Sequence, residues 1–177
     1  MADRNFLLPS LDAVENMYQT LLGRHVVVKR ALSIGVPSDL GVAGVYVDGD
    51  GAEAVLVYAD YKLANGAGAA LSMVPVGGVE DANDGKEIPA NFFDNFAEVL
   101  NVLTVLFNDR HKNAKRARLG GAYIYPDDLP EGIASHFGAG GESEFVAVFP
   151  TNKSHIGTRQ ISGKGKGRLF DANWFVS

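Results

Sequence analysis

Apolar residues recur at helical spacing in three segments of the chain. In residues 11–22, one face would hold Leu11, Val14, Tyr18, Leu21 and Leu22. Ser10 is in position to cap this helix at its start, and Gly23 to end it. Residues 60–74 predict a second, short helix that Asp60 would cap, with glycines that let another backbone come close. Residues 91–108 predict the longest and most apolar helix.

Strand-like composition appears between these helices and after the last one. The pattern predicts strands at residues 25–31, 41–48, 53–59, 119–126 and 145–150, and weaker ones at 155–162 and 168–176 around a Gly/Lys turn. Residues 41–48 and 53–59 are joined by Gly and Asp residues and predict a hairpin. Residues 75–90 and 127–144 are rich in Gly, Asp and Pro and predict loops. We therefore expect one α+β domain over residues 1–177, with a mainly antiparallel sheet and about three helices packed on it.

The helix over residues 91–108 separates its polar and apolar residues into two faces. On a helical wheel, the other polar residues of one face all fall within a quarter turn on either side of Glu98: Asn91, Asp94, Asn95, Asn101 and Asn108. We call this face, with Glu98 at its middle, the polar stripe. The remaining arc holds the residues expected to be buried: Phe92, Phe93, Phe96, Val99, Leu100, Leu103, Leu106 and Phe107.

A polar stripe is most often only the solvated side of a surface helix. Two details favour a contact with another protein. The helix has no Lys or Arg, so it lacks the intrahelical ion pairs of an ordinary surface helix. Val102 and Val105 also fall within the stripe, one on each side of Glu98. Valines beside a carboxylate and an amide are typical of a docking surface.

Composition and charge exclude several kinds of function. The net charge of −5 argues against a nucleic-acid-binding protein. There is no cysteine for thiolate catalysis, and the four histidines are too scattered for a catalytic zinc site. No segment has the length of a membrane span or the core of a signal peptide, so we expect a soluble, cytoplasmic protein.

The spacing Asp94-x3-Glu98-x2-Asn101, with Pro126 downstream, resembles the CheC/CheX/FliY phosphatases of bacterial chemotaxis. The order of predicted elements before this motif is similar to that of CheX, and the resemblance covers roughly residues 8–150. CheC-type members carry the motif twice. Here the leading helix has Glu15, but Tyr18 stands where the second Asn would be, so one site remains, as in CheX.

The resemblance implies hydrolysis of the aspartyl phosphate on a CheY-like response regulator. Asn101 would position the attacking water, and Glu98 would pair with the lysine beside the phosphorylation site. Asp94 would either extend this acidic contact or favour the first turn of its helix. The protein would need no cofactor of its own, because Mg²⁺ is expected on the partner. Family members such as CheX form dimers through sheet edges, so the resemblance also allows a homodimer.

The chain departs from the family at one position, and a second function stays open. The family usually has glycine four residues after the Asn, where this chain has Val105, which would either widen the docking contact or obstruct it. The alternative is a non-catalytic interaction module, because the flagellar switch protein FliM keeps a related domain without the Glu/Asn pair. The pair argues for catalysis here, and Val105 argues against it.

Overall fold

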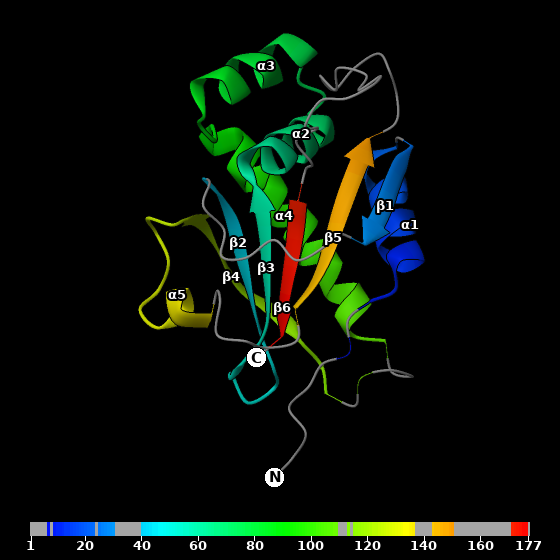
Figure 1. Cartoon of the computed structure of the whole chain (residues 1–177), viewed down its shortest axis with the longest axis vertical. Helices are drawn as coiled ribbons and strands as arrows, with labels where there is room; N and C mark the ends of the chain where they lie inside the picture. Colours follow the sequence, from blue (N-terminus) through cyan, green and yellow to red (C-terminus); the bar gives the residue numbers. More distant parts are fainter. Residues whose placement is uncertain are drawn as a thin grey trace.

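The computed structural model describes residues 7, 9–23, 25–30, 40–109, 113, 115–136, 143–150 and 171–176. Figure 1 shows the order of the elements. The helices are α1 (Leu11–Leu22), α2 (Tyr61–Leu71), α3 (Val76–Gly85), α4 (Ala90–Phe107) and α5 (Ile133–His136). The strands are β1 (Val26–Arg30), β2 (Gly41–Val47), β3 (Glu53–Asp60), β4 (Arg118–Tyr125), β5 (Ser143–Pro150) and β6 (Asp171–Val176).

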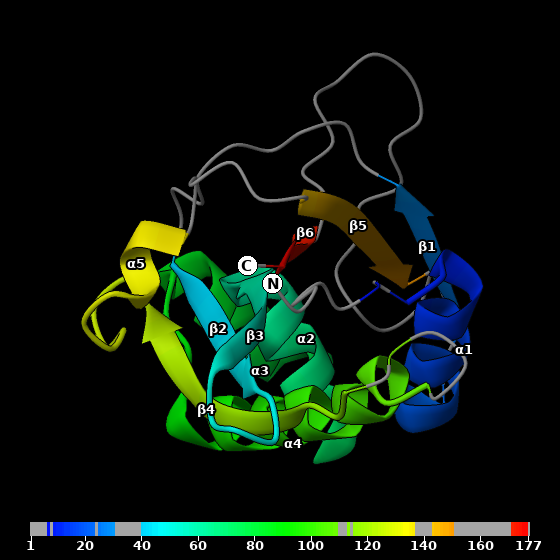
Figure 2. The same ribbon diagram turned by 90° about the horizontal axis from the view of Figure 1, so that it is seen from below.

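The strands form one six-stranded sheet in the order β1-β5-β6-β3-β2-β4. Every pairing among the described strands is antiparallel. Helix α4 lies against β2 and β4, with α2 beside it and α1 near its other end. Seen from below, α4 follows the outer side of the molecule, opposite β5 and β6 (Figure 2). This arrangement confirms the predicted α+β fold with an antiparallel sheet and helices packed on it.

The sheet is buried on both faces around the hairpin of β2 and β3. Alternate residues of the two strands point to opposite sides and enter two different clusters. The larger cluster, shared with α1, α2 and α4, takes Val42, Tyr46, Val55, Val57 and Ala59. The smaller cluster takes Ala43, Val45, Leu56 and Tyr58 together with Ile133 of α5. Burial on both sides explains why these strands read as continuous apolar runs instead of alternating ones.

The predicted helix caps are confirmed. The side chain of Ser10 accepts a hydrogen bond from the backbone N–H of Ala13, and Gly23 ends α1 in the left-handed conformation at φ 60°. The side chain of Asp60 accepts from the backbone N–H of Leu63 at 2.8 Å and starts α2. The predicted hairpin is also confirmed, with β2 and β3 paired over their length.

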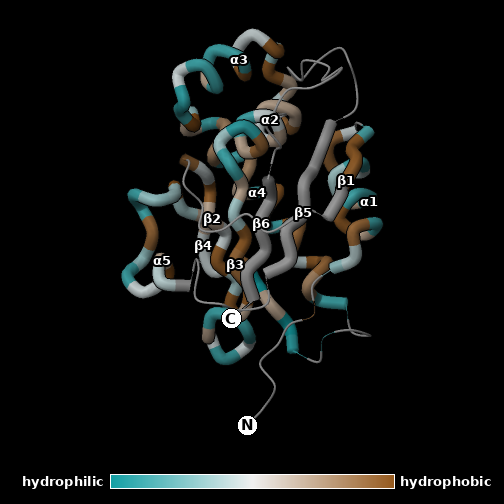
Figure 3. Tube along the Cα trace, in the orientation of Figure 1, coloured by the Kyte–Doolittle hydropathy of each residue, from teal (hydrophilic) through white to brown (hydrophobic). Residues whose placement is uncertain are grey.

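The prediction of a loop over residues 75–90 is wrong, because α3 occupies residues 76–85. Its own sequence favours a helix weakly, with three glycines and no side-chain hydrogen bond at its start. Tertiary contacts stabilise it instead: Val79 and Ala82 are buried against α2 and α4. The buried Asn65 of α2 also donates hydrogen bonds to the side chain of Asn83 and to the backbone beyond α3. Figure 3 shows that the rest of α3 is mostly hydrophilic.

The prediction of a loop over residues 127–144 also missed a short helix. Helix α5 lies there because Ile133 is buried in the smaller cluster. The weak strand at residues 155–162 and the Gly/Lys turn lie outside the described residues, whereas β6 falls within the other weak segment. Among the helices of the described residues, none is both long enough and apolar enough to cross a membrane.

Candidate functional site

The candidate site is the outward face of α4. Asp94, Glu98 and Asn101 are all exposed, and Val105 is 70% exposed. Val102 is partly exposed on the same side. All five candidate residues therefore lie on one face of one helix, as the sequence predicted. Opposite them, Phe92, Phe96, Val99, Leu100, Leu103 and Phe107 are buried, and Phe93 and Leu106 are partly buried.

Glu98 and Asn101 are neighbours on this face, one turn apart along α4. Their i, i+3 spacing places their Cβ atoms about 5–6 Å from each other. Within the part of the chain that the structure describes, no hydrogen bond or ion pair is found for either side chain. A carboxylate and a carboxamide that face solvent in this way are free to contact another molecule.

Two members of the polar stripe have structural roles instead. Asn95 donates a hydrogen bond from its Nδ2 to the Oγ of Ser72 at the end of α2, at 2.9 Å. Asn108, at the end of α4, donates to the carbonyl of Ala117 at 2.9 Å and accepts from its N–H at 2.8 Å. The polar residues of the stripe that face outward are therefore Asn91, Asp94, Glu98 and Asn101.

The sheet fixes the position of α4 at the residue before Asn101. The buried Tyr46 of β2 donates its hydroxyl to the carbonyl of Leu100 at 2.5 Å. Burial raises the pKa of this hydroxyl well above its ordinary value, so it stays a neutral donor. Gly44 of the same strand leaves room for the Leu100 side chain, because a Cβ at this position would lie 3.2 Å from the Leu100 methyl groups. These contacts of Leu100 fix the backbone of α4 directly before Asn101.

Helix α2 packs alongside α4. A Cβ on Gly68 would overlap the backbone carbonyl of Phe92, so glycine is required for this close approach of the two helices. The sequence had indicated the glycines of the second helix as a place of close backbone contact, and Gly68 provides it. With the sheet beneath it and α2 beside it, α4 presents its outward residues from a rigid element.

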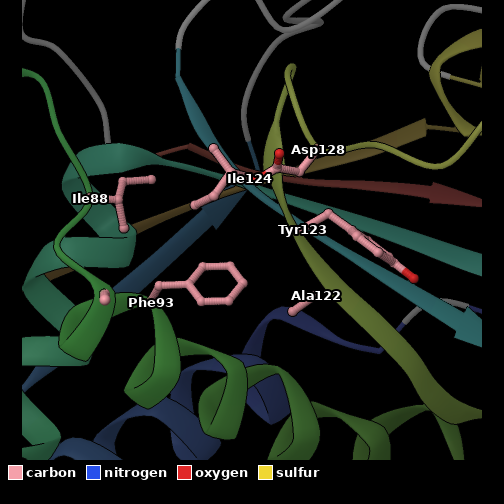
Figure 4. Close-up of a pocket in the computed structure, with 7 residues that line it drawn as sticks. Ile88, Phe93, Ala122, Tyr123, Ile124 and Asp128 are labelled. Atoms are coloured by element: carbon pink, nitrogen blue, oxygen red, sulfur yellow. The ribbon is translucent and has the colours of Figure 1, made fainter.

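A groove of about 450 Å³ runs between the first half of α4 and the edge strand β4. Figure 4 shows Phe93 pointing toward Ile124 and Ala122 across it. Its lining is otherwise Ile88, Ala90, Tyr123 and Asp128. The sequence did not predict this groove. The helical wheel places Phe93 among the residues expected to be buried, and its position at the border of the apolar arc is the only sign of the groove in the sequence.

Pro126 of the motif and Glu15 of the leading helix also have clear positions. Pro126 is exposed in the turn that follows β4, which the backbone hydrogen bond from Asp128 to Ile124 closes at 2.9 Å. It therefore lies at the end of the groove, on a different element from α4. Glu15 of α1 accepts a hydrogen bond from the backbone N–H of Val28 at 2.9 Å. Its carboxylate helps to hold β1, which is a structural role.

Within the described residues, no group of three or more His, Asp or Glu side chains is arranged to hold a metal ion. Asp94 and Glu98 instead give the outward face of α4 a negative charge that no Lys or Arg of this helix offsets. The face is therefore suited to a partner with a basic group.

No protein-family model matches this chain, and no match was found among curated proteins.

Proposed function

We propose that this chain is a phosphatase of the CheC/CheX/FliY type, most like CheX, which accelerates hydrolysis of the aspartyl phosphate on a receiver domain. The observation that carries the proposal is the exposed pair Glu98 and Asn101, one turn apart on a helix held by the sheet and by α2. The spacing of the pair resembles the motif of that family.

The protein has to supply only a small part of the chemistry of this reaction. An acyl phosphate has a reactive phosphorus and a good leaving group, and the Mg²⁺ of the receiver domain offsets charge on the transferring group. Water attacks phosphorus, the bond from phosphorus to the aspartate oxygen breaks, and phosphate and the free carboxylate are formed with release of one proton. What the partner lacks is a water held in line with that bond.

Asn101 is suited to position this water. A carboxamide accepts a hydrogen bond from water through its oxygen and donates through its nitrogen at the same time. Because it is neutral, it approaches the phosphoryl oxygens without repulsion. Its exposure allows it to enter a pocket on another protein.

Glu98 has the complementary role of an anchor. A carboxylate would be repelled by the phosphoryl group, so it pairs instead with a lysine beside the phosphorylation site. This pairing sets the register of α4 so that Asn101 enters the pocket. Asp94 extends the acidic contact, and Val102 and Val105 supply apolar area around it.

The proposal has consequences for the setting of the protein. It works in the cytoplasm with a phosphorylated CheY-like regulator and takes part in chemotaxis or another two-component pathway. A homodimer through a sheet edge belongs to the same proposal, and β1 and β4 are the outer strands of the sheet.

The test is the lifetime of phospho-aspartate on candidate receiver domains, with and without the protein. We expect the protein to shorten the lifetime on its cognate domain. Glu98→Ala should raise the concentration needed for half of the maximal effect, because it removes the anchoring charge. Glu98→Lys reverses the charge at the same exposed position and should weaken the effect further. A lifetime that stays the same on a domain to which the protein binds would refute the phosphatase proposal.

That last outcome would support the rival function, a non-catalytic interaction module on the same scaffold. The observation that favours the rival is Val105, which is 70% exposed at the position where the family usually has glycine. Val105→Gly distinguishes the two. If Val105 obstructs catalysis, Val105→Gly should gain dephosphorylating activity that the wild-type chain lacks, which would favour the rival; a loss of affinity with an unchanged maximal rate would favour the phosphatase, in which Val105 supplies docking area.

A further inference from the structure

Met73 is the most exposed of the large apolar side chains in the described part of the chain. Its exposed fraction is 89%, against 70% for Val105 of α4. It follows Ser72, the C-cap of α2, and precedes α3. An exposed apolar side chain points to a binding surface when other unusual features lie beside it. The backbone conformation of Met73 is such a feature.

Met73 occupies a backbone conformation that normally selects glycine. Its φ is 55°, in the left-handed region. The N–H of Val74 bonds to the carbonyl of Ala69, and the N–H of Met73 bonds to that of Ala70. This is the hydrogen-bond pattern of a helix end in which glycine is preferred after the C-cap. A methionine here strains the backbone and leaves its side chain in water, so it does not contribute to the stability of the fold.

The position of Met73 connects it to the outward face of α4. The neighbouring Ser72 accepts the hydrogen bond from Asn95, which lies one turn before Glu98. Val105 lies on the other side of Glu98 along the helix. From Asn95 to Val105 the helix rises about 15 Å. Glu98 thus lies along the helix between Asn95, which contacts the residue next to Met73, and the exposed Val105, and Asp94 directly precedes Asn95.

We infer that Met73 is part of the docking surface for the receiver domain, on which its side chain contacts an apolar area next to the basic group that Glu98 binds. The inference rests on the proposed function. Charge complementarity selects this partner: the face carries Asp94 and Glu98, and α4 has no Lys or Arg. A flexible methionine adapts well to a partner surface.

The experiment compares Met73→Asn with Lys86→Asn. Asparagine tolerates the left-handed conformation, so Met73→Asn removes the apolar side chain and relieves the backbone together. Lys86 is the matched control because it is exposed, has φ 51° and ends α3 with the same hydrogen-bond pattern. Both variants should keep the melting temperature unchanged or raise it by about 2–4 °C.

Binding is measured by fluorescence anisotropy with labelled receiver domains, with beryllofluoride in place of the phosphoryl group. Phospho-aspartate lifetimes are measured in parallel. Met73→Asn should weaken binding about tenfold and leave the maximal rate of dephosphorylation unchanged. Lys86→Asn should not weaken binding, because it removes no apolar contact and no negative charge.

Wild-type affinity in Met73→Asn would overturn the inference while leaving the phosphatase proposal intact. Binding without any change in lifetime would overturn the phosphatase proposal, and the affinity of Met73→Asn would still decide the role of Met73. A wild-type protein that binds no receiver domain of its organism would overturn both.

Discussion

Substitution to alanine should change the stability of the protein in opposite directions at Asn101 and Asn108 of α4. Asn101 is exposed, and within the described residues its side chain has no hydrogen-bond partner. Asn108, at the C-cap, exchanges two hydrogen bonds with the backbone of the buried Ala117. The substitution to alanine therefore removes only an outward side chain at Asn101, but removes a tie between α4 and the start of β4 at Asn108.

The expected changes in the free energy of unfolding follow from these environments. Alanine is a better helix former than asparagine by roughly 0.5 kcal/mol, so Asn101→Ala should stabilise the protein by about that amount. Asn108→Ala loses two hydrogen bonds and leaves both backbone groups of Ala117 without them, which should cost roughly 1–3 kcal/mol. The two variants should differ by about 1.5–3.5 kcal/mol in total.

The assay is equilibrium unfolding in urea, followed by far-UV circular dichroism. Its midpoint should rise slightly for Asn101→Ala and fall clearly for Asn108→Ala, with the slope unchanged in both. A loss of about 1 kcal/mol or more in Asn101→Ala would refute the reasoning, because it would give Asn101 a structural role. Equal effects of the two substitutions would refute it as well.

Three further predictions concern the support of the site. Gly68→Ala should lower the free energy of unfolding in urea by roughly 1–3 kcal/mol, because its methyl group would overlap the backbone of α4. Gly77→Ala should not lower it, because a methyl group there meets open space. Equal effects of the two substitutions would contradict this prediction. Tyr46→Phe should cost about 0.5–1.5 kcal/mol through loss of the buried hydroxyl's bond to α4, and an unchanged midpoint would count against it. A hydrogen bond from Lys115, at 3.0 Å, holds the pKa of Asp48 below its ordinary value. This pair should therefore stabilise the fold fully above about pH 4 and lose its effect as the pH falls through the lowered pKa. Lys115→Met should reduce the loss of stability over that acidic range, and an unchanged loss would exclude the pair as its cause.

The elements that the sequence predicted well are those in which local and tertiary preferences agree. Ser10, Gly23 and Asp60 perform the capping roles that their residue types favour. The outward and buried faces of α4 follow directly from helical periodicity. For the same reason, the exposure of Glu98 and Asn101 could be predicted from the sequence.

The elements that were missed depend on contacts between distant segments. Helix α3 is weakly helical by sequence and is held by Val79 and by the buried Asn65 of α2. The roles of Asn95 and Asn108 also depend on partners in other elements, so the wheel could not separate them from Asn101. The groove exists because β4 lies beside α4, and the strain at Met73 is seen only in its backbone φ angle. The spacing of apolar residues along the sequence predicts neither feature.

The central claim is that Asn101 positions the attacking water. Its most direct test is the first-order rate constant of phospho-aspartate loss from the cognate receiver domain, at saturating concentrations of the wild-type protein and of Asn101→Ala. Removal of one positioned polar group typically costs about 10²–10³ in rate, so the variant should bind the domain normally and fall close to the spontaneous rate. A saturating Asn101→Ala variant that clears the phosphoryl group at the wild-type rate would contradict the claim.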